Sequence, residues 1–548
     1  MHKSINSSFK LRPLAAAVAI IGINMMAVPL AQAGSLNLGD LLVSSTTYVD
    51  PGFGVGAALP NSKSGSGVAS AASGFCNSSD CVNNVWNNSL ASSAVPGTGG
   101  NDGNFGTTSG IMLRSVNANT GAVTGSLDVT AAAAAQGLNL VTSFASKSEL
   151  ALNVTPDGRS VTFMGYNNTT GRLDVSNSAT PGISGATYGE PGNTDTANPT
   201  FRGVAQLNVA TGALQYTTTN AYAGNNGRAA ILGSNGLYYT AGNAGNGNGS
   251  SLITGANGIQ LITPGSNAPS TPSATPGTNA IGAFNITQLG YTADKTAKDS
   301  NYRGLTVFNN TLYATKGSGG NGINTIYQIG TAGSLPTGTG AATPVTVLPG
   351  MNTSLASATN TPHPFGIWFA NDHTLYVADE GSGKATDFTD KSTKAGGLQK
   401  YVLQNGTWNL AYTLGGDIVG QSYTATGQGS LAGISLNVTT DGFRNLTGRV
   451  NDDGTVSLFT VTSTEGSVLG DAGAEPNKLV YFTDNLSYGA ADASTATSTE
   501  LATTLMTASV GEAIRGVALP VPEPESYALA LMSLGILGVA AKRQRRQG

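Results

Sequence analysis

Short apolar runs, each preceded by a polar turn, recur along most of the chain. The turns are rich in Asn, Asp and Gly, which accept a positive φ and so favour tight hairpins. The runs carry the aromatic and β-branched residues typical of strands. The five turn-and-strand pairs are Pro156-Asp157-Gly158 before Ser160–Met164, Ser234-Asn235-Gly236 before Leu237–Thr240, Asn309-Asn310 before Leu312–Thr315, Asn371-Asp372 before Leu375–Ala378, and Asp452-Asp453-Gly454 before Val456–Thr460. This pattern predicts an all-β body of antiparallel strand pairs.

A second short element lies just upstream of most of these turns and predicts an inner strand for each unit. Its five occurrences are Arg228-Ala229-Ala230, Arg303-Gly304-Leu305, Phe365-Gly366-Ile367, Arg444-Asn445-Leu446 and Arg515-Gly516-Val517. They recur at intervals of about 60 to 80 residues, longer than the roughly 40–50 residues of a compact propeller blade, so loops must absorb the excess. Candidate outer strands fill the intervals: Gly203–Thr219 folded at Thr211-Gly212, Ile323–Ile329, and Leu398–Leu414 folded at Asn405-Gly406.

Radial repetition of four-stranded units leaves only short, protected sheet edges, so the pattern favours a closed β-propeller. The first strand, Asp40–Tyr48, has no inner strand before it, and the last, Ile514–Leu519, has no hairpin partner after it. If these two pair, the N- and C-terminal strands share one blade and close the ring. Six blades are favoured, and a seventh built within residues 105–145 stays open.

Composition agrees with a loop-rich but folded body. Of 548 residues 75 are Gly and 10% are charged, yet 39% are hydrophobic, which is enough for a core. Residues 34–520 keep 19 of the 26 basic and 28 of the 30 acidic residues, a net charge of −9. A body with this net negative charge lacks the basic surface that nucleic-acid binding requires, and anionic lipid would repel it.

The N-terminus carries the features of a signal peptide over residues 1–33. Cations at Lys3, Lys10 and Arg12 precede an apolar stretch, and Ala31 and Ala33 provide the small side chains that signal peptidase requires before Gly34. The alternative is an uncleaved membrane anchor.

The C-terminal segment 521–548 has three parts in order. Pro522-Glu523-Pro524 leads into a nearly uncharged run, 527–541, and Lys542, Arg543, Arg545 and Arg546 follow. A helix of this run would reach about 22 Å, short of a bilayer core of about 30 Å, and the basic cluster would stay cytoplasmic. The segment resembles the PEP-CTERM sorting signal. That resemblance implies transient inner-membrane anchoring and cleavage by an exosortase near the Pro-Glu-Pro, in bacteria that make exopolysaccharide. An ordinary C-terminal anchor is the alternative.

The body, over residues 150–518, resembles a family of secreted bacterial proteins of uncharacterised function. The segments that carry the resemblance are Asp157–Tyr166, Leu375–Gly381, Gly396–Trp408 and Ile514–Ala518. Tyr401 replaces a tryptophan of the family pattern. The resemblance implies a propeller-like fold and supplies no chemistry.

Residues 57–109 interrupt the first blade with Gly, Ser and Asn and contain Cys76 and Cys81, the chain's 2 cysteines. In an oxidising compartment two close cysteines are expected to pair. A redox-active pair is the alternative, but the C-x-x-C spacing is missing.

Candidate catalytic chemistry is sparse. His363 and His373 are the histidines beyond the leader, and no H-E-x-x-H, G-x-S-x-G or calcium-loop motif occurs. Asp379-Glu380, Asp452-Asp453 and Asp484 are expected in solvated turns; a loop calcium stays open, and no other cofactor is indicated.

The arginines at the inner-strand starts are the strongest candidate site: Arg228, Arg303, Arg444 and Arg515. In a propeller they lie near one end of the central channel, where guanidinium groups could bind an anionic ligand. The alternative is that each one clips blade-junction carbonyls. The sequence thus favours a non-enzymatic protein of the exopolysaccharide or biofilm matrix, with exopolysaccharide as a possible partner; the alternative is a propeller hydrolase or lyase acting on polysaccharide.

The cysteine pairing gives a first prediction. Thiol labelling under denaturing, non-reducing conditions should find no free thiol at Cys76 or Cys81. Because the ring they close is small and lies in an inserted loop, reduction should barely change the melting temperature, although a ring of this size can contribute about 2 kcal/mol. A large loss of stability on reduction would place the loop in the core.

Overall fold

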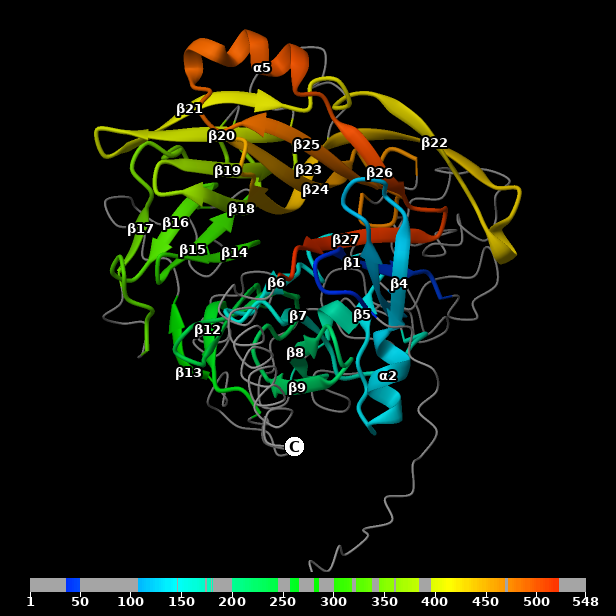
Figure 1. Ribbon diagram of the computed structural model, residues 1–548. Helices are drawn as coiled ribbons and strands as arrows, with labels where there is room; N and C mark the ends of the chain where they lie inside the picture. The colour runs from blue at the N-terminus through cyan, green and yellow to red at the C-terminus, as the bar shows by residue number, and fades with distance from the viewer. Residues whose placement is uncertain are drawn as a thin grey trace, which may run out of the picture.

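The computed structural model describes residues 36–49, 107–144, 146–172, 175–178, 180, 200–244, 257–265, 280–284, 300–317, 322–337, 344–358, 361–383, 396–468 and 472–521. Six antiparallel sheets surround a common axis in a closed β-propeller (Figure 1). The leader, Cys76 and Cys81, and the tail from Pro522 onward lie outside the described residues.

Each blade is one sheet, and its strands are given in order from the innermost to the outermost. Blade 1 is β27 (Glu512–Ala518), β1 (Leu41–Thr47), β3 (Ile111–Val116) and β4 (Val123–Asp128). Blade 2 is β6 (Asn153–Val154), β7 (Ser160–Tyr166), β8 (Arg202–Asn208) and β9 (Leu214–Thr219). Blade 3 is β10 (Gly227–Leu232), β11 (Tyr238–Gly242), β12 (Gly258–Ile262) and β13 (Ala280–Phe284).

Blade 4 is β14 (Leu305–Phe308), β15 (Thr311–Lys316), β16 (Thr325–Ile329) and β17 (Val345–Val347). Blade 5 is β18 (Pro364–Asn371), β19 (Thr374–Asp379), β20 (Gly397–Gln404) and β21 (Thr407–Leu414). Blade 6 has β23 (Ser435–Val450), β24 (Thr455–Thr464), β25 (Lys478–Asn485) and β26 (Thr503–Thr507), and β22 (Ser422–Thr426) pairs with the first part of β23.

The remaining elements are small. A two-stranded sheet joins β2 (Thr108–Ser109) to β5 (Thr142–Ser143). The helices are α2 (Val129–Ala135) and α5 (Ala493–Thr499), with 3-10 turns η1 (Val175–Asn177), η4 (Gly429–Leu431) and η5 (Ala490–Asp492). Asp128 caps α2 by accepting a hydrogen bond from the Ala131 backbone N–H at 2.8 Å.

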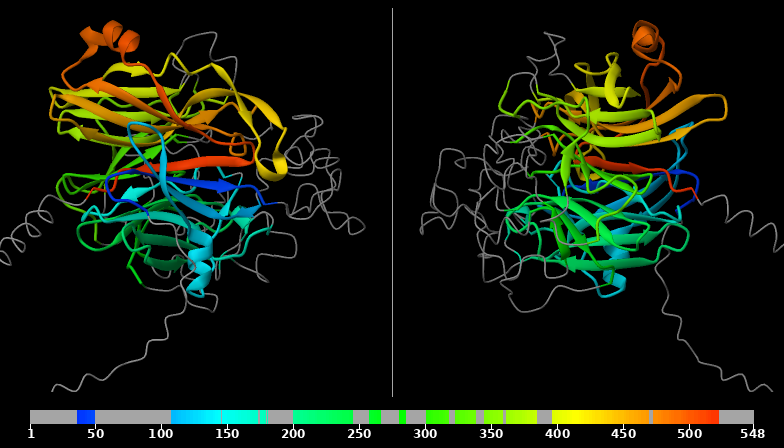
Figure 2. Two further views of the ribbon diagram at one scale, coloured as in Figure 1. Left: turned by 45° about the vertical axis from the view of Figure 1, so that its right-hand side comes forward. Right: turned by 90° about the vertical axis from the view of Figure 1, so that its left-hand side faces the viewer.

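The predicted closure of the ring is confirmed. β1 pairs antiparallel with β27, with Leu42 opposite Ala518 and Thr47 opposite Glu512, and the two strands lie side by side in every view (Figures 1 and 2). Six blades, the favoured number, are present. The stretch considered for a seventh supplies the outer strands β3 and β4 of blade 1 instead, because β27 and β1 alone would leave that blade without its outer half.

Adjacent blades touch through backbone at their inner strands. A Cβ at Gly304, Gly366 or Gly516 would lie 2.2–2.4 Å from a carbonyl oxygen of the next blade's inner segment, so those glycines permit the approach. Hydroxyl groups on the second strands bind the same segments: Ser44 Oγ donates to Leu150 O at 2.7 Å, and Thr315 Oγ1 donates to Phe365 O at 2.6 Å. Sequence repeats with Gly at the inner strand therefore encode close blade packing.

A buried ion pair links blades 5 and 6 farther out. Lys400 Nζ and Asp484 Oδ2 lie 2.9 Å apart with both side chains fully buried, and the hydroxyls of Tyr376 and Tyr412 donate to the same carboxylate. The expectation that Asp484 sits in a solvated turn is therefore wrong. The Asp484 carboxylate lies near the end of β25 and faces blade 5. There the Lys400 ammonium and two tyrosine hydroxyls offset the free-energy cost of burying it.

Ring closure can be tested by truncation. A chain ending at residue 512 loses β27 and should be less stable by more than about 4 kcal/mol, because several buried side chains and the pairing with β1 go with it. A chain ending at residue 521 keeps the whole strand and should unfold like the parent in urea. Equal unfolding midpoints for the two truncations would contradict a closure held by β27.

Candidate functional site

Three of the four predicted arginines, Arg228, Arg444 and Arg515, share a local backbone irregularity that the sequence did not reveal. In the β10–β11 register Arg228 is the extra residue between Gly227 and Ala229, and Arg515 is the extra residue in the β1–β27 register. The β23–β24 register is likewise irregular across Arg444. A β-bulge turns its extra side chain out of the alternating pattern of the strand. Each of these arginines can therefore reach toward a neighbouring segment at the ring's centre.

Their described contacts are with inner segments of the ring. Arg228 donates to Asn301 Oδ1 and, at 2.8 Å, to Tyr302 O, while Arg303 donates to Ser148 Oγ. These contacts tie blade 3 to the entry of blade 4, and blade 4 to the entry of blade 2.

The other two arginines reach consecutive residues of the β24–β25 connection. Arg444 Nη1 lies 3.5 Å from Ala472 O, and Arg515 Nη2 donates to Gly473 O at 2.7 Å and to Phe144 O. The structure thus brings all four arginines into one region at the centre of the ring. Their contacts are those expected of the clip alternative, and a direct role in ligand binding stays a prediction.

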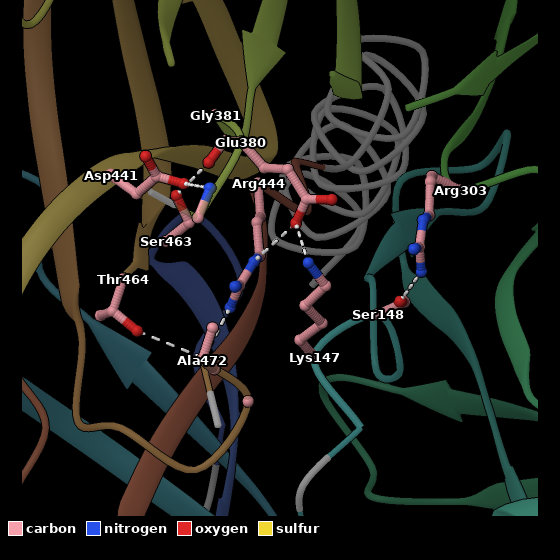
Figure 3. A network of polar contacts seen from close by, with 12 residues as sticks. Lys147, Ser148, Arg303, Glu380, Gly381, Asp441, Arg444, Ser463, Thr464 and Ala472 are labelled. Carbon is pink, nitrogen blue, oxygen red and sulfur yellow. Dashed lines mark hydrogen bonds and ion pairs between the residues drawn. The ribbon is translucent and has the colours of Figure 1, made fainter. Parts of the chain in front are cut away.

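Glu380 lies at the centre of this region (Figure 3). Its carboxylate oxygen is 3.2 Å from Arg444 Nε and 3.2 Å from Lys147 Nζ. The backbone holds it as well, since Ser463 Oγ donates to Glu380 O at 2.6 Å and Glu380 N donates to His363 O at 3.0 Å. We call Lys147, Arg303, Glu380, Asp441 and Arg444 the axial charge cluster; its members come from the entries of blades 2 and 4, from blade 5 and from blade 6.

Lys147 is carried by a short segment that is fixed on both sides. Ser148 accepts from Arg303. Glu149 accepts from Thr142 Oγ1 at 2.7 Å, from Asn226 Nδ2 at 2.8 Å and from the Tyr166 hydroxyl. The next residue, Leu150, has φ 61°, a strained conformation for a bulky side chain that surrounding contacts must enforce. The Lys147 side chain is 36% exposed, whereas that of Glu380 is 2% exposed.

The pKa shifts in the cluster follow from burial and crowding of cations. Burial lowers the pKa of Lys147, the Glu380 charge opposes this, and Arg444 and Arg303 add to the lowering. Burial by itself would raise the pKa of Glu380, but Lys147, Arg303, Arg444 and His363 together lower it to about 2. Burial and the nearby Arg303 also lower the pKa of Arg228. Three cations therefore surround one firmly ionised carboxylate.

Asp441 is the member of the axial charge cluster whose protonation changes near neutral pH. Its Oδ2 accepts from Gly383 N at 2.7 Å, and its carboxylate lies 2.5–2.6 Å from where a Cβ on Gly381 would be. Burial raises its pKa to about 7, the Glu380 charge adds to the rise, and Lys147 and Arg444 oppose it. Because Gly381 has φ +76°, the turn after β19 needs glycine at this position for both its conformation and its contact with Asp441.

Two residues that were expected in a solvated turn are buried here, and two residues of this region were not predicted from the sequence. Asp379 and Glu380 are both 2% exposed and do not lie in a solvated turn, because they end β19 where inner segments of other blades converge. Asp379 accepts from His363 N at 2.9 Å, and burial raises its pKa. Lys147 and Ser148 were missed; the irregular stretch just before a predicted inner strand was the available signal.

The histidines add no metal site in the part of the chain that the structure describes. His363 is half-buried beside Asp379, and His373 is exposed in the β18–β19 turn. Over those residues, no three His, Cys, Asp or Glu side chains are grouped to hold a metal ion. Chemically, the axial charge cluster offers fixed cationic N–H donors.

The raised pKa of Asp441 predicts that the fold loses stability as the pH rises from about 4 to about 7. A carboxyl that stays protonated up to about pH 7 in the folded protein but ionises near its ordinary value of 3.8 when unfolded stabilises the fold at low pH, and this stability is lost as pH rises through about 7. Asp441→Asn should flatten the fall in unfolding free energy between about pH 4 and pH 7.

Glu500, whose pKa burial and Asp484 raise to about 8, contributes a loss of the same sign. Glu500 is present in both the parent and the Asp441→Asn variant. The difference between their pH profiles of unfolding free energy therefore reports on Asp441 alone. Parallel pH profiles would refute the shift.

Comparisons with known proteins bear on the end of the chain more than on the propeller. No curated protein matches. A solved polysaccharide lyase of a new family, PL25 ulvan lyase bound to -[GlcA(1-4)Rha3S]-, is similar at 9% identity over 73% of this chain and 79% of that chain, with a TM-score of 0.30. That likeness is too remote to support an argument about function.

Residues 520–546 match the PEP-CTERM protein-sorting motif, as the sequence predicted. Over the described residues, no helix has the length and apolar character to cross a membrane. The motif implies processing by an exosortase. It marks the chain as an exported protein that is transiently anchored in the membrane before it reaches the cell surface or the extracellular space.

Proposed function

We propose that this protein is a non-enzymatic component of the exopolysaccharide or biofilm matrix, with the closed propeller as its binding body. The PEP-CTERM motif at residues 520–546 is the observation that carries the proposal, since it directs the body to the surface where exopolysaccharide accumulates. Signal peptidase removes residues 1–33, and the exosortase removes the tail beyond Pro522-Glu523-Pro524. Arg228, Arg303, Arg444 and Arg515 supply positive potential for an anionic partner.

Charge distribution supports a binding role. The body carries a net −9 over residues 34–520, yet at the axis Lys147, Arg303 and Arg444 surround Glu380. An acidic protein with a local excess of cations directs anions to that point and repels them elsewhere. Binding to an anionic matrix polymer would therefore be specific to the axis.

The second candidate is a propeller hydrolase or lyase acting on polysaccharide. The observation that favours it is the convergence of Lys, Arg, Glu and Tyr side chains, the residue types that such chemistry uses. Against it, Glu380 is 2% exposed with a pKa of about 2, unsuited to proton transfer near neutral pH, and Tyr166 is 1% exposed. Incubation with acidic polysaccharides should release no reducing ends and no unsaturated uronate; steady release would favour the enzyme.

The sorting route predicts the mass of the mature protein. Protein recovered from the envelope and the culture medium should lack residues 1–33 and most residues beyond Pro524, as read by intact mass spectrometry. A variant with Pro522-Glu523-Pro524 replaced by three alanines should keep its tail and accumulate in the inner membrane. Recovery of the full-length C-terminus from the outer surface of wild-type cells would contradict the proposal.

A further inference from the structure

We propose that Lys147 is the ligand-contacting residue of an anion-binding site at the axis, and that its ligand is a glycan bearing carboxylate or sulfate groups. The inference rests on the proposed function and narrows it to one residue and one class of ligand. The four arginines then act as positioning residues, because their exposed fractions are 3–6%.

Accessibility singles out Lys147 within the axial charge cluster. Its side chain is 36% exposed, compared with 4% for Arg444 and 2% for Glu380. An ammonium group has three N–H donors. The contact to Glu380 at 3.2 Å uses one donor, so the ammonium group has donors left for a ligand. Lys147 is thus the most exposed cation of the axial charge cluster, although enough groups surround it for burial to lower its pKa.

Charge balance explains why the ligand is an anion. Around Glu380 stand Lys147, Arg303 and Arg444, so one carboxylate faces three cations. Asp441 opposes them only partly, because its pKa of about 7 leaves it half protonated at neutral pH. The mutual repulsion that helps to lower the pKa of Lys147 is relieved when a further negative charge arrives. A carboxylate or sulfate therefore completes the cluster, and a neutral sugar does not.

The Lys147 segment is ordered in advance of binding. Arg303 holds Ser148, and four hydrogen bonds hold Glu149, one of them from the Ser143 backbone N–H at 3.0 Å. A segment fixed in this way loses little conformational freedom when a ligand arrives. Even a single contact through Lys147 can then contribute measurably to affinity.

The test measures binding of the purified full chain to polygalacturonate, dextran sulfate and neutral dextran at low ionic strength. We expect binding to one or both anionic polymers, weakened by salt, and none to dextran. Lys147→Met should weaken binding at least about tenfold, the effect of losing a charged hydrogen bond, and Lys147→Arg should restore most of it. Which polymer binds separates carboxylate from sulfate.

Arg449→Gln is the matched control, since it removes one cation from the exposed C-terminal end of β23, five residues after Arg444. It should bind like the parent. A second measurement needs no variant: bound polymer should slow acylation of Lys147 but not of Lys478, which lies over the Tyr423 ring.

Three results would overturn the inference: equal binding of dextran, no binding of either anionic polymer, or unchanged affinity and unprotected Lys147. None of them would affect the sorting route, which the mass of the mature protein tests separately.

Discussion

The antiparallel pairing of β1 with β27 is the constraint on which the rest of the structure depends. It joins residues more than 460 positions apart and turns a row of blades into a ring. A second contact reinforces it: a Cβ on Gly121, in the β3–β4 turn of blade 1, would lie 2.2 Å from Leu505 O on β26 of blade 6. Blade 1 therefore meets blade 6 through its outer hairpin as well as its inner strand.

Two buried ionic sites of this ring lie where blades meet. Lys400 and Asp484 lie between blades 5 and 6, and Glu380 lies where several inner segments converge. Isolated burial of either carboxylate would cost several kcal/mol, so each has at least one cation and further donors. The two sites differ in the ratio of cations to carboxylates. Asp484 is matched by one lysine and two phenols, whereas Glu380 faces a surplus of cations, one of which remains open to solvent.

The sequence predicted the architecture because its signals are local and repeated. Asn405 with φ 52° and Gly406 with φ 76° form the hairpin that their residue types indicate, and Gly212 turns β8 into β9 as expected. The unpartnered first and last strands were enough to predict closure. Residues at the axis were harder to place, because the burial of Asp379 and Glu380 depends on segments of other blades that have no fixed spacing in the chain. The bulges at Arg228 and Arg515 were equally hidden, since a bulge is a mismatch between two strands and has no signature in either alone.

Closure and the axial charge cluster are physically connected through Arg515. This residue is the bulge of β27, the closing strand, and it donates to Phe144 O and Gly473 O. Phe144 lies three residues before Lys147, and Gly473 follows Ala472, which contacts Arg444. The strand that shuts the ring thus also fixes the two connections beside Glu380. Seating of β27 against β1 therefore helps to hold the connection that places Lys147 against Glu380. A charge surplus at the axis is therefore a property of the closed ring and does not belong to any single blade.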